Sequence, residues 1–174
     1  MKNQITSFQH LPTSINELNC NNNQITSFQH LPNSVTHLYC SNNHITIFQH
    51  LPNSVTKLYC LYNQITSSQY LIHSVTVLDC RNNQITSFQH LVNSVTTLFC
   101  DNNYITNFQH QPNGVTKVYC FNNRINTIEN ILDYPGEFIV IPNRIYKNRV
   151  LYGLNKINKI YKNKKVGKII GIMI

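Results

Sequence analysis

A twenty-residue unit repeats along most of the 174-residue chain, and this period limits the fold more than any other feature. One copy, residues 31–50, reads LPNSVTHLYCSNNHITIFQH. Its apolar positions, with an asparagine among them, match the leucine-rich-repeat template L-x-x-L-x-L-x-x-N-x-L, with cysteine in the third apolar position. A unit this short cannot bury its apolar face alone, so successive units must stack on one another. The period therefore predicts a solenoid.

Each unit contains a short alternating segment that suits a β-strand. In the first one, Leu18 and Cys20 are apolar while Glu17 and Asn19 are polar, which is the period of two that a strand with one buried face requires. Strands that recur every twenty residues are too far apart for hairpins and should pair in parallel, one per coil. A seventh strand is expected over residues 137–141. The first six segments end at Cys20, Cys40, Cys60, Cys80, Cys100 and Cys120.

The segment that returns to the next strand is too short and too interrupted for a helix. Proline at positions 12, 32, 52 and 112 fixes φ and favours extended or turn geometry. We therefore expect an all-β-like leucine-rich-repeat solenoid. It should have a parallel sheet of about seven short strands on its concave face and extended or 3₁₀ segments on its convex face.

The repeat covers residues 1–145, and the rest of the chain differs in character. Residues 1–13 correspond to the second half of a unit, and residues 121–145 form a degenerate closing unit of the kind that caps a repeat array. Residues 146–174 form a basic, partly amphipathic tail or cap. Its final apolar run is far shorter than the ~20 residues of a transmembrane helix, so no transmembrane segment is expected.

The six cysteines occupy one inward position, once per unit, and this column predicts small buried thiols in a reducing compartment. Neighbouring parallel strands lie roughly 4.8 Å apart, so distance alone does not exclude pairwise disulfides. The N-terminus has no apolar signal region, since its residues already match the second half of a repeat unit. These features predict a cytoplasmic protein, located in the host cytoplasm if the chain is viral.

The net charge of +8 is distributed unevenly. Residues 1–143 carry five Lys or Arg and all six acids, whereas residues 144–174 carry nine basic residues and no acid. The repeat body is therefore nearly neutral. Any affinity for nucleic acid or anionic membranes would have to come from the tail.

Stacked coils turn each position of the unit into a column, and the asparagine after the strand is the first of interest. A buried amide needs partners, and it can bond backbone groups of its own coil and of the next one. We therefore expect a structural ladder, which Asn3 would begin at the N-terminus. Its members are Asn23, Asn43, Asn63, Asn83, Asn103 and Asn123.

A second column contains histidines on the returning side, interrupted by Tyr70. Imidazoles at ~5 Å intervals are able to bind a transition metal, but no closed set of ligands is marked, and a repeated surface residue is the simpler interpretation. The cysteine column lacks the Cys-x-x-Cys spacing of zinc sites. No phosphate-binding loop, nucleophile elbow or carboxylate pair is present, so we predict no catalytic residue, metal or cofactor. The histidines are His10, His30, His50, His90 and His110.

The outward positions of the strands vary from unit to unit while the core positions barely change. Solvent exposure alone would permit this variation, but the column after each central leucine or valine contains four aromatic residues, more apolar surface than a solvated face needs. We therefore predict a partner-binding surface. Its apolar anchors are Tyr39, Tyr59, Phe99 and Tyr119, and the residues that set its charge complementarity are His37, Lys57, Arg81 and Lys117.

The run LPNSVTHLYCSNNHI resembles the short leucine-rich repeats of bacterial effectors, whose units also begin with Leu-Pro. It is also similar to the Leu-Pro-x-Ser repeats, including the FNIP type, of amoebae and of the giant viruses that infect them. This resemblance covers residues 1–145 and implies a solenoid that binds proteins through its concave sheet. Some relatives carry a ubiquitin-ligase domain with a catalytic cysteine after the repeats, but no cysteine follows Cys120 here. Others carry an F-box before the repeats, whereas this sequence begins inside a repeat unit.

The sequence thus predicts a non-enzymatic protein-interaction scaffold, in a setting such as host manipulation. The alternative function is binding of nucleic acid or anionic membranes through the basic tail, with the repeats as a support. A third interpretation is that the tail only caps the last coil, with its isoleucines buried and its lysines solvated.

Overall fold

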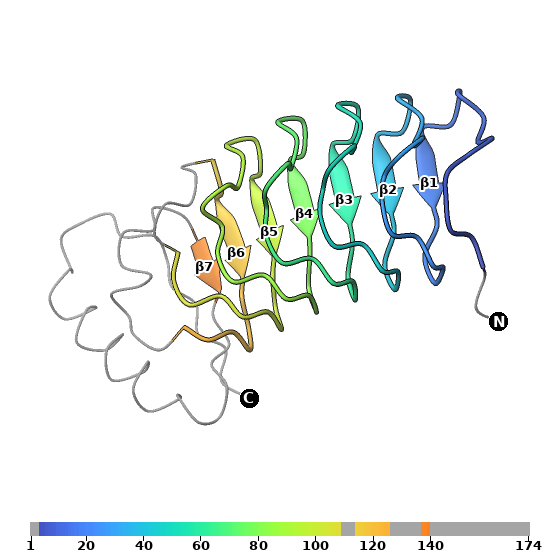
Figure 1. The fold of residues 1–174 in the computed structure, drawn as a ribbon. Helices are drawn as coiled ribbons and strands as arrows, with labels where there is room; N and C mark the ends of the chain where they lie inside the picture. The colour runs from blue at the N-terminus through green and yellow to red at the C-terminus, as the bar shows by residue number, and fades with distance from the viewer. Residues whose placement is uncertain (1–3, 109–113, 126–136, 140–174) are drawn as a thin grey trace, which may run out of the picture.

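The computed structural model of the chain describes residues 4–108, 114–125 and 137–139. Within these ranges the backbone forms a stack of coils, each of which contributes one strand to a seven-stranded parallel sheet (Figure 1). The strands follow one another across the sheet in chain order. They are β1 Glu17–Asn19, β2 His37–Tyr39, β3 Lys57–Tyr59, β4 Val77–Asp79, β5 Thr97–Phe99, β6 Lys117–Tyr119 and β7 Glu137–Ile139. The predicted leucine-rich-repeat solenoid is confirmed.

The register between strands is constant along the stack. Each strand residue pairs with the residue twenty positions later, as Leu38 does with Leu58 and Tyr39 with Tyr59. Hydrogen bonding continues beyond the strand, because the N–H of Cys40 donates to the Tyr59 carbonyl oxygen at 2.8 Å. Since a slip of one residue would turn the apolar positions outward, the buried face maintains this register and keeps like residues in columns.

The core lies between the sheet and the returning segments and runs along the whole described stack. In the coil around β3, Val55, Leu58, Cys60 and Ile65 have no exposed surface. Repetition of this set in the neighbouring coils makes one continuous apolar interior. Stability therefore depends on contacts between coils, as expected for a repeat array.

All six cysteines are buried and free, as the uniform column predicted. Burial raises the pKa of the Cys20 thiol from 9.0 to about 12, and it raises the pKa of Cys60 well above the usual value. A thiol that holds its proton more tightly when folded destabilises the fold only at alkaline pH. We therefore expect stability to fall as the pH rises from 9.0 towards 12.

The returning segment contains two consecutive turns. In one coil the N–H of Leu51 donates to the Phe48 carbonyl oxygen at 3.2 Å, and the N–H of Val55 donates to the Pro52 carbonyl oxygen at 3.1 Å. His50 occupies the third position of the first turn with φ of 65°, as a type II turn requires. Turns and extended segments account for the convex side, and the described residues include neither a helix nor a 3₁₀ segment.

Strand β7 confirms that the repeat pattern continues into the degenerate closing unit, although the strand ends at Ile139 and residues 140 and 141 lie outside the described residues. The tail of residues 146–174 and the proposed boundary at residue 145 also lie outside them. In the ranges that are described, no helix is long and apolar enough to cross a membrane.

Candidate partner-binding surface

The asparagine column faces the interior, and each of its amides joins two coils. The Nδ2 group of Asn63 donates to the Cys60 carbonyl oxygen at 3.1 Å in its own coil and to the Cys40 carbonyl oxygen at 3.0 Å in the preceding coil. Its Oδ1 accepts the N–H of Ile45 at 3.0 Å. The neighbour that receives these bonds is thus the preceding coil, whereas the sequence analysis expected the next one. The same bonds recur at Asn43, Asn83, Asn103 and Asn123.

Two further columns, which sequence reasoning missed, also bond neighbouring coils. The hydroxyl of Ser54 donates to the Val35 carbonyl oxygen at 2.7 Å, and the hydroxyl of Thr56 donates to the Thr36 carbonyl oxygen at 3.2 Å. The repeated asparagine, serine and threonine residues of these three columns therefore hold the stack together. The candidate partner-binding residues have to be sought among the positions that change from coil to coil.

The outward face of the sheet is the side that points away from the core, and it contains two aromatic stacks. A single coil separates the two stacks. The rings of Tyr39 and Tyr59 lie with centroids 4.7 Å apart and planes inclined by 3°. The rings of Phe99 and Tyr119 lie 4.6 Å apart at 13°. All four residues are half-buried, because each ring covers a face of its neighbour. The structure thus brings the four predicted anchors together in two pairs.

The coil between the two stacks contains an ion pair. Asp79 is only 4% exposed, and its Oδ1 and Oδ2 accept the Nε and Nη2 hydrogens of Arg81 at 2.8 and 2.6 Å. This bidentate bond raises the pKa of Arg81, and the guanidinium carbon also lies 5.6 Å from the centre of the Phe99 ring. The charge of Arg81 is therefore largely balanced within the protein. Sequence reasoning missed the burial of Asp79.

The other predicted charged residues border the aromatic stacks. Lys57 and His37 are half-buried and pair across β2 and β3, and Lys117 is exposed on β6. The ring of His37 shares a hydrogen bond with the Thr36 hydroxyl through Nδ1 at 3.0 Å. Burial, together with the negative charge of Glu17, raises the pKa of the Tyr39 phenol.

The third outward column has a partly structural role. The Oδ1 of Asn21 accepts the N–H of Ser41 at 2.6 Å, and the Oδ1 of Asp101 accepts the N–H of Phe121 at 2.6 Å. Burial is the main reason that the pKa of Asp101 is raised. These side chains support the edge of the outward face by bonding the next coil.

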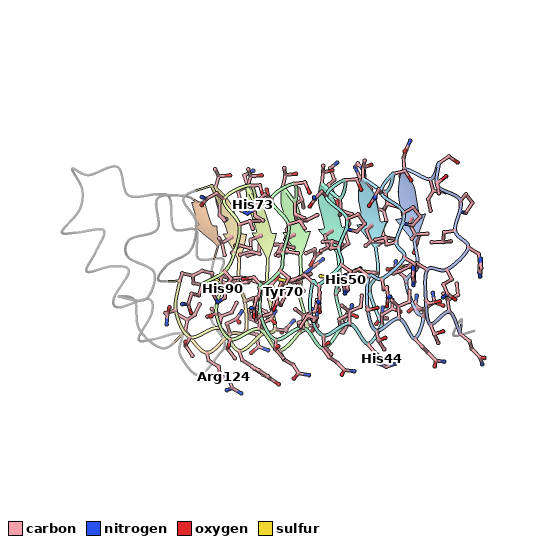
Figure 2. The ribbon with its side chains drawn as sticks, turned by 45° about the horizontal axis from the view of Figure 1, so that its top comes forward. His44, His50, Tyr70, His73, His90 and Arg124 are labelled. Atoms are coloured by element: carbon pink, nitrogen blue, oxygen red, sulfur yellow. The ribbon has the colours of Figure 1, made fainter. Side chains whose placement is uncertain are left out.

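The histidine column lies away from this surface. Figure 2 shows His50, Tyr70 and His90 in a row on successive coils, all of them exposed. His10, His30 and His50 have positive φ, a conformation for which histidine is enriched, so the turn accounts for their repetition. His110 lies outside the described residues. Among the residues that are described, no group of three or more His, Cys, Asp or Glu side chains is placed to hold a metal ion.

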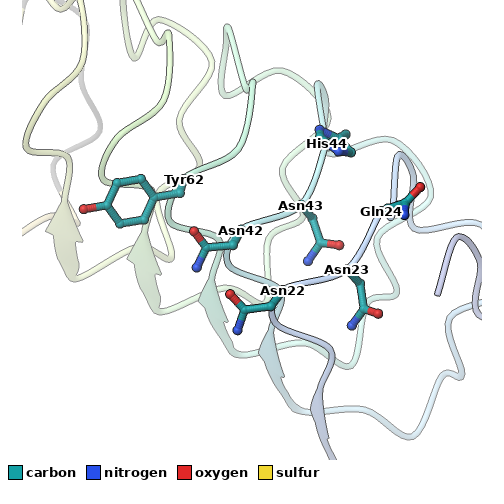
Figure 3. Close-up of a pocket in the computed structure, with 7 residues that line it drawn as sticks. All are labelled: Asn22, Asn23, Gln24, Asn42, Asn43, His44 and Tyr62. Atoms are coloured by element: carbon teal, nitrogen blue, oxygen red, sulfur yellow. The ribbon is translucent and has the colours of Figure 1, made fainter. Parts of the chain in front are cut away.

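A pocket of about 380 Å³ opens beside the exits of the strands, where sequence reasoning placed no site (Figure 3). Its lining includes the exposed residues Asn22, Asn42 and Tyr62, with two amides of the asparagine column between them and a second exposed row. The one signal in the sequence was Tyr62, which interrupts a column of asparagines. None of the eight predicted partner-binding residues lines this pocket.

Comparison with solved structures supports the fold. YopM from Yersinia enterocolitica superposes with a TM-score of 0.62 at 26% identity, over 81% of this chain and 29% of YopM. The leucine-rich-repeat domain of a Shigella effector gives 0.63 at 19% identity, over 91% and 82%. The functional domain of InlJ from Listeria monocytogenes, which includes a cysteine ladder, gives 0.53 at 21% identity, over 82% and 38%. No protein-family model matches the sequence, and no curated protein does.

The protein is therefore a leucine-rich-repeat-type solenoid with twenty-residue units, and it resembles the repeat domains of bacterial effectors. Scaffolds of this class typically bind proteins and are usually not enzymes. The chain spans 29% of YopM and 38% of the InlJ chain, so the similarity concerns the repeats and not those whole proteins.

Proposed function

We propose that this protein is a non-enzymatic scaffold that recognises a protein partner through the outward face of its sheet. The two aromatic stacks of that face are the observation that carries the proposal. They present four half-buried aromatic residues on a surface that the solenoid leaves open to solvent. Tyrosine is enriched among the residues that dominate binding energy in protein interfaces.

The stacks are already ordered before any partner arrives. Each ring of Tyr39 and Tyr59 is held parallel to the other, and the same is true of Phe99 and Tyr119. Because a side chain fixed in advance loses little conformational entropy on binding, these rings are suitable anchors. An incoming apolar side chain would bury the ring edges that remain exposed.

The charged neighbours favour an acidic partner. Lys57 and Lys117 border the two stacks, while the charge of Arg81 is balanced by Asp79. Glu17 stands at the N-terminal end of the same column, beside His37. We expect complementary carboxylates to determine how the partner is oriented and how fast it associates, more than how tightly it binds.

Affinity capture from the host or parent cell tests this surface. The test variant is Tyr39→Ala/Tyr59→Ala/Tyr119→Ala. The matched control changes three exposed tyrosines elsewhere to the residue of an equivalent position, Tyr62→Asn/Tyr70→His/Tyr104→Gln. A partner held by the wild type and the control, and lost by the test variant, would support the proposal. A partner kept by a test variant that melts like the wild type would place recognition elsewhere.

The effector-type repeats of YopM and of the Shigella protein support the further proposal that the protein acts on a host cell, in the cytoplasm. The resemblance to amoebal and giant-virus repeats suggests the same setting. Expression of a tagged chain in an amoebal host, followed by fractionation, tests it. A tagged chain confined to membranes or to the medium would contradict the cytoplasmic placement.

The alternative function depends on the C-terminal part of the chain, because residues 144–174 contain nine basic residues and no acidic one. If the tail binds RNA, DNA or anionic vesicles, deletion of residues 150–174 should abolish the binding, and salt should weaken it steeply. Equal binding by the truncated and full chains would end this hypothesis.

A further inference from the structure

The pocket beside the strand exits is formed by two rows of exposed side chains from successive coils. In Figure 3, Asn22, Asn42 and Tyr62 project to one side, and Gln24 and His44 lie on the other. The buried amides of Asn23 and Asn43 lie between the rows.

The amides of the first row are available to a ligand. Within the described part of the chain, the side chains of Asn22 and Asn42 form no hydrogen bond with another protein group. At the other end of the same column, Asn122 Nδ2 donates to Asn102 Oδ1 at 2.8 Å, so two amides of this column are able to satisfy each other. In the second row the His44 ring bonds Gln64 through Nδ1 at 3.1 Å.

Tyr62 is the exceptional residue of the pocket. It adopts φ of 51°, where the other coils place asparagines, such as Asn42 with φ of 56°. Asparagine tolerates this left-handed conformation, whereas a bulky aromatic residue is an outlier there. The side chain gains little packing in return, since it is 56% exposed. Tyr70 of the same coil is a similar outlier with φ of 64°, but of these two tyrosines Tyr62 alone lines the pocket.

The lining selects for a neutral ligand with many hydroxyl groups. No carboxylate, lysine or arginine contributes to it. Each free amide offers a donor and an acceptor side by side, which matches neighbouring sugar hydroxyls that both donate and accept. The exposed tyrosine ring offers an apolar face for the C–H groups of a pyranose. Coils recur every ~4.8 Å, so a ligand that follows the rows must itself be a chain of similar units.

We propose that this pocket binds a neutral oligosaccharide, with Tyr62 as the stacking platform and the amides of Asn22, Asn42 and Gln24 as hydrogen-bonding partners. The sugar chain lies across three successive coils, and His44 closes its far side. This site is separate from the outward face of the sheet, so the protein is able to hold a glycan and a protein partner together.

Titration of the full chain with neutral hexasaccharides tests the proposal. The probes are maltohexaose, cellohexaose and hexa-N-acetylchitohexaose, and binding is followed by isothermal titration calorimetry and by ¹⁵N chemical shifts. At least one probe should bind with a Kd of about 1 mM or below. Tyr62→Asn should weaken it about tenfold or more, the loss expected on removal of an aromatic anchor.

The control is Tyr70→His, in the same coil. Tyr70 is also 56% exposed and has φ of 64°, but it does not line the pocket. This variant should bind like the wild type. Thermal melts show whether both variants are folded, and Tyr62→Asn should be the more stable protein because asparagine suits the conformation.

Four results would overturn the proposal. One is the absence of binding by all three hexasaccharides at millimolar concentration. Another is a Tyr62→Asn variant that binds as the wild type does. The third is an equal loss in the Tyr70→His control. If the shifted amides belong to the outward strand face and not to the coils around Tyr62, the sugar binds elsewhere and the assignment of this pocket is wrong.

Discussion

Two neighbouring coils, residues 42–61 and 62–81, follow the same backbone path with different side chains. Their turns are closed by equivalent bonds, from Leu51 N–H to the Phe48 carbonyl oxygen at 3.2 Å and from Leu71 N–H to the Ser68 carbonyl oxygen at 3.1 Å. Their strands pair residue for residue. The differences lie at ten positions: Asn42 and Tyr62, His44 and Gln64, Ile47 and Ser67, Phe48 and Ser68, His50 and Tyr70, Pro52 and Ile72, Asn53 and His73, Lys57 and Val77, Tyr59 and Asp79, Leu61 and Arg81.

The difference shows which positions the fold requires. Valine, leucine, cysteine, isoleucine and the ladder asparagine are the same in both coils, and these columns are enough to form the coil. Ser68 is 1% exposed and its hydroxyl has no hydrogen-bond partner, so the second coil tolerates an unsatisfied group where the first has a buried ring. Residues 62–81, the irregular coil of the two, also provide two of the most exposed tyrosines and the central ion pair. Residues 42–61 are the regular coil.

The largest effect is expected from making the regular coil like the irregular one. Phe48→Ser removes a ring that has no exposed surface, and it should lower the free energy of unfolding by about 3–5 kcal/mol. Denaturant unfolding measures this value. A loss below about 1 kcal/mol would show that the phenylalanine column contributes little packing.

The ladder asparagine is common to both coils, and its removal should cost about 3 kcal/mol, the upper end of the range for a buried group left unpaired. Asn63→Ala leaves the N–H of Ile45 without its acceptor. Asn53→Ala is the control, since Asn53 is exposed. Equal shifts in melting temperature for the two variants would show that the column does not act as an interior ladder.

The ion pair should matter less, because Arg81 is partly exposed. Arg81→Ser leaves the Asp79 carboxylate buried and unpaired, which should cost about 2 kcal/mol, below the ~3–5 kcal/mol of a fully buried pair. The double variant Asp79→Tyr/Arg81→Ser gives this coil the outward aromatic of its neighbour and should recover most of the loss. A double variant as unstable as Arg81→Ser would mean that an aromatic ring in this coil does not connect the two aromatic stacks into one continuous stack.

Filling the irregular core position should produce a moderate gain. Ser68→Phe places a ring between the coils of Phe48 and Phe88, removes an unsatisfied hydroxyl and should raise the unfolding free energy by about 1–2 kcal/mol. The rings of Phe88 and Phe108 already stack across adjacent coils with centroids 6.2 Å apart. A lower melting temperature would indicate that the coils have closed over this position.

The smallest effect concerns backbone strain. Tyr62→Asn should stabilise the protein by about 1 kcal/mol, because asparagine adopts positive φ more readily than tyrosine. The reverse change in the regular coil, Asn42→Tyr, should have the opposite sign. If both variants lowered the melting temperature, Tyr62 would have to make packing contacts that outweigh its strain.

Much of this architecture could be predicted from the period alone. The spacing placed all seven strands, including β7, and it assigned Leu58 and Cys60 to the interior. The preceding-coil direction of the Asn63 bonds was not predictable, since both neighbours contain the same backbone groups. The serine and threonine bonds would have been accessible to the same column reasoning that identified the asparagines.

The candidate sites were less accessible to sequence reasoning. The aromatic columns predicted that Tyr39 would lie beside Tyr59, and their rings do stack. The burial of Asp79 could not be predicted, because an alternating strand pattern assigns that position to the outward face. The pocket around Tyr62 was missed because its lining comes from three coils and no single unit contains it.

The sequence by itself determined the register, the interior columns and the parallel sheet, because a strict period offers a short strand only one arrangement that buries every copy of its apolar side. Tertiary structure decided how the variable residues are used. Whether Asp79 is exposed, and whether Asn22, Asn42 and Tyr62 face a common space, depends on side chains brought within contact distance by stacking. The local pattern that forms each coil contains no information about that proximity.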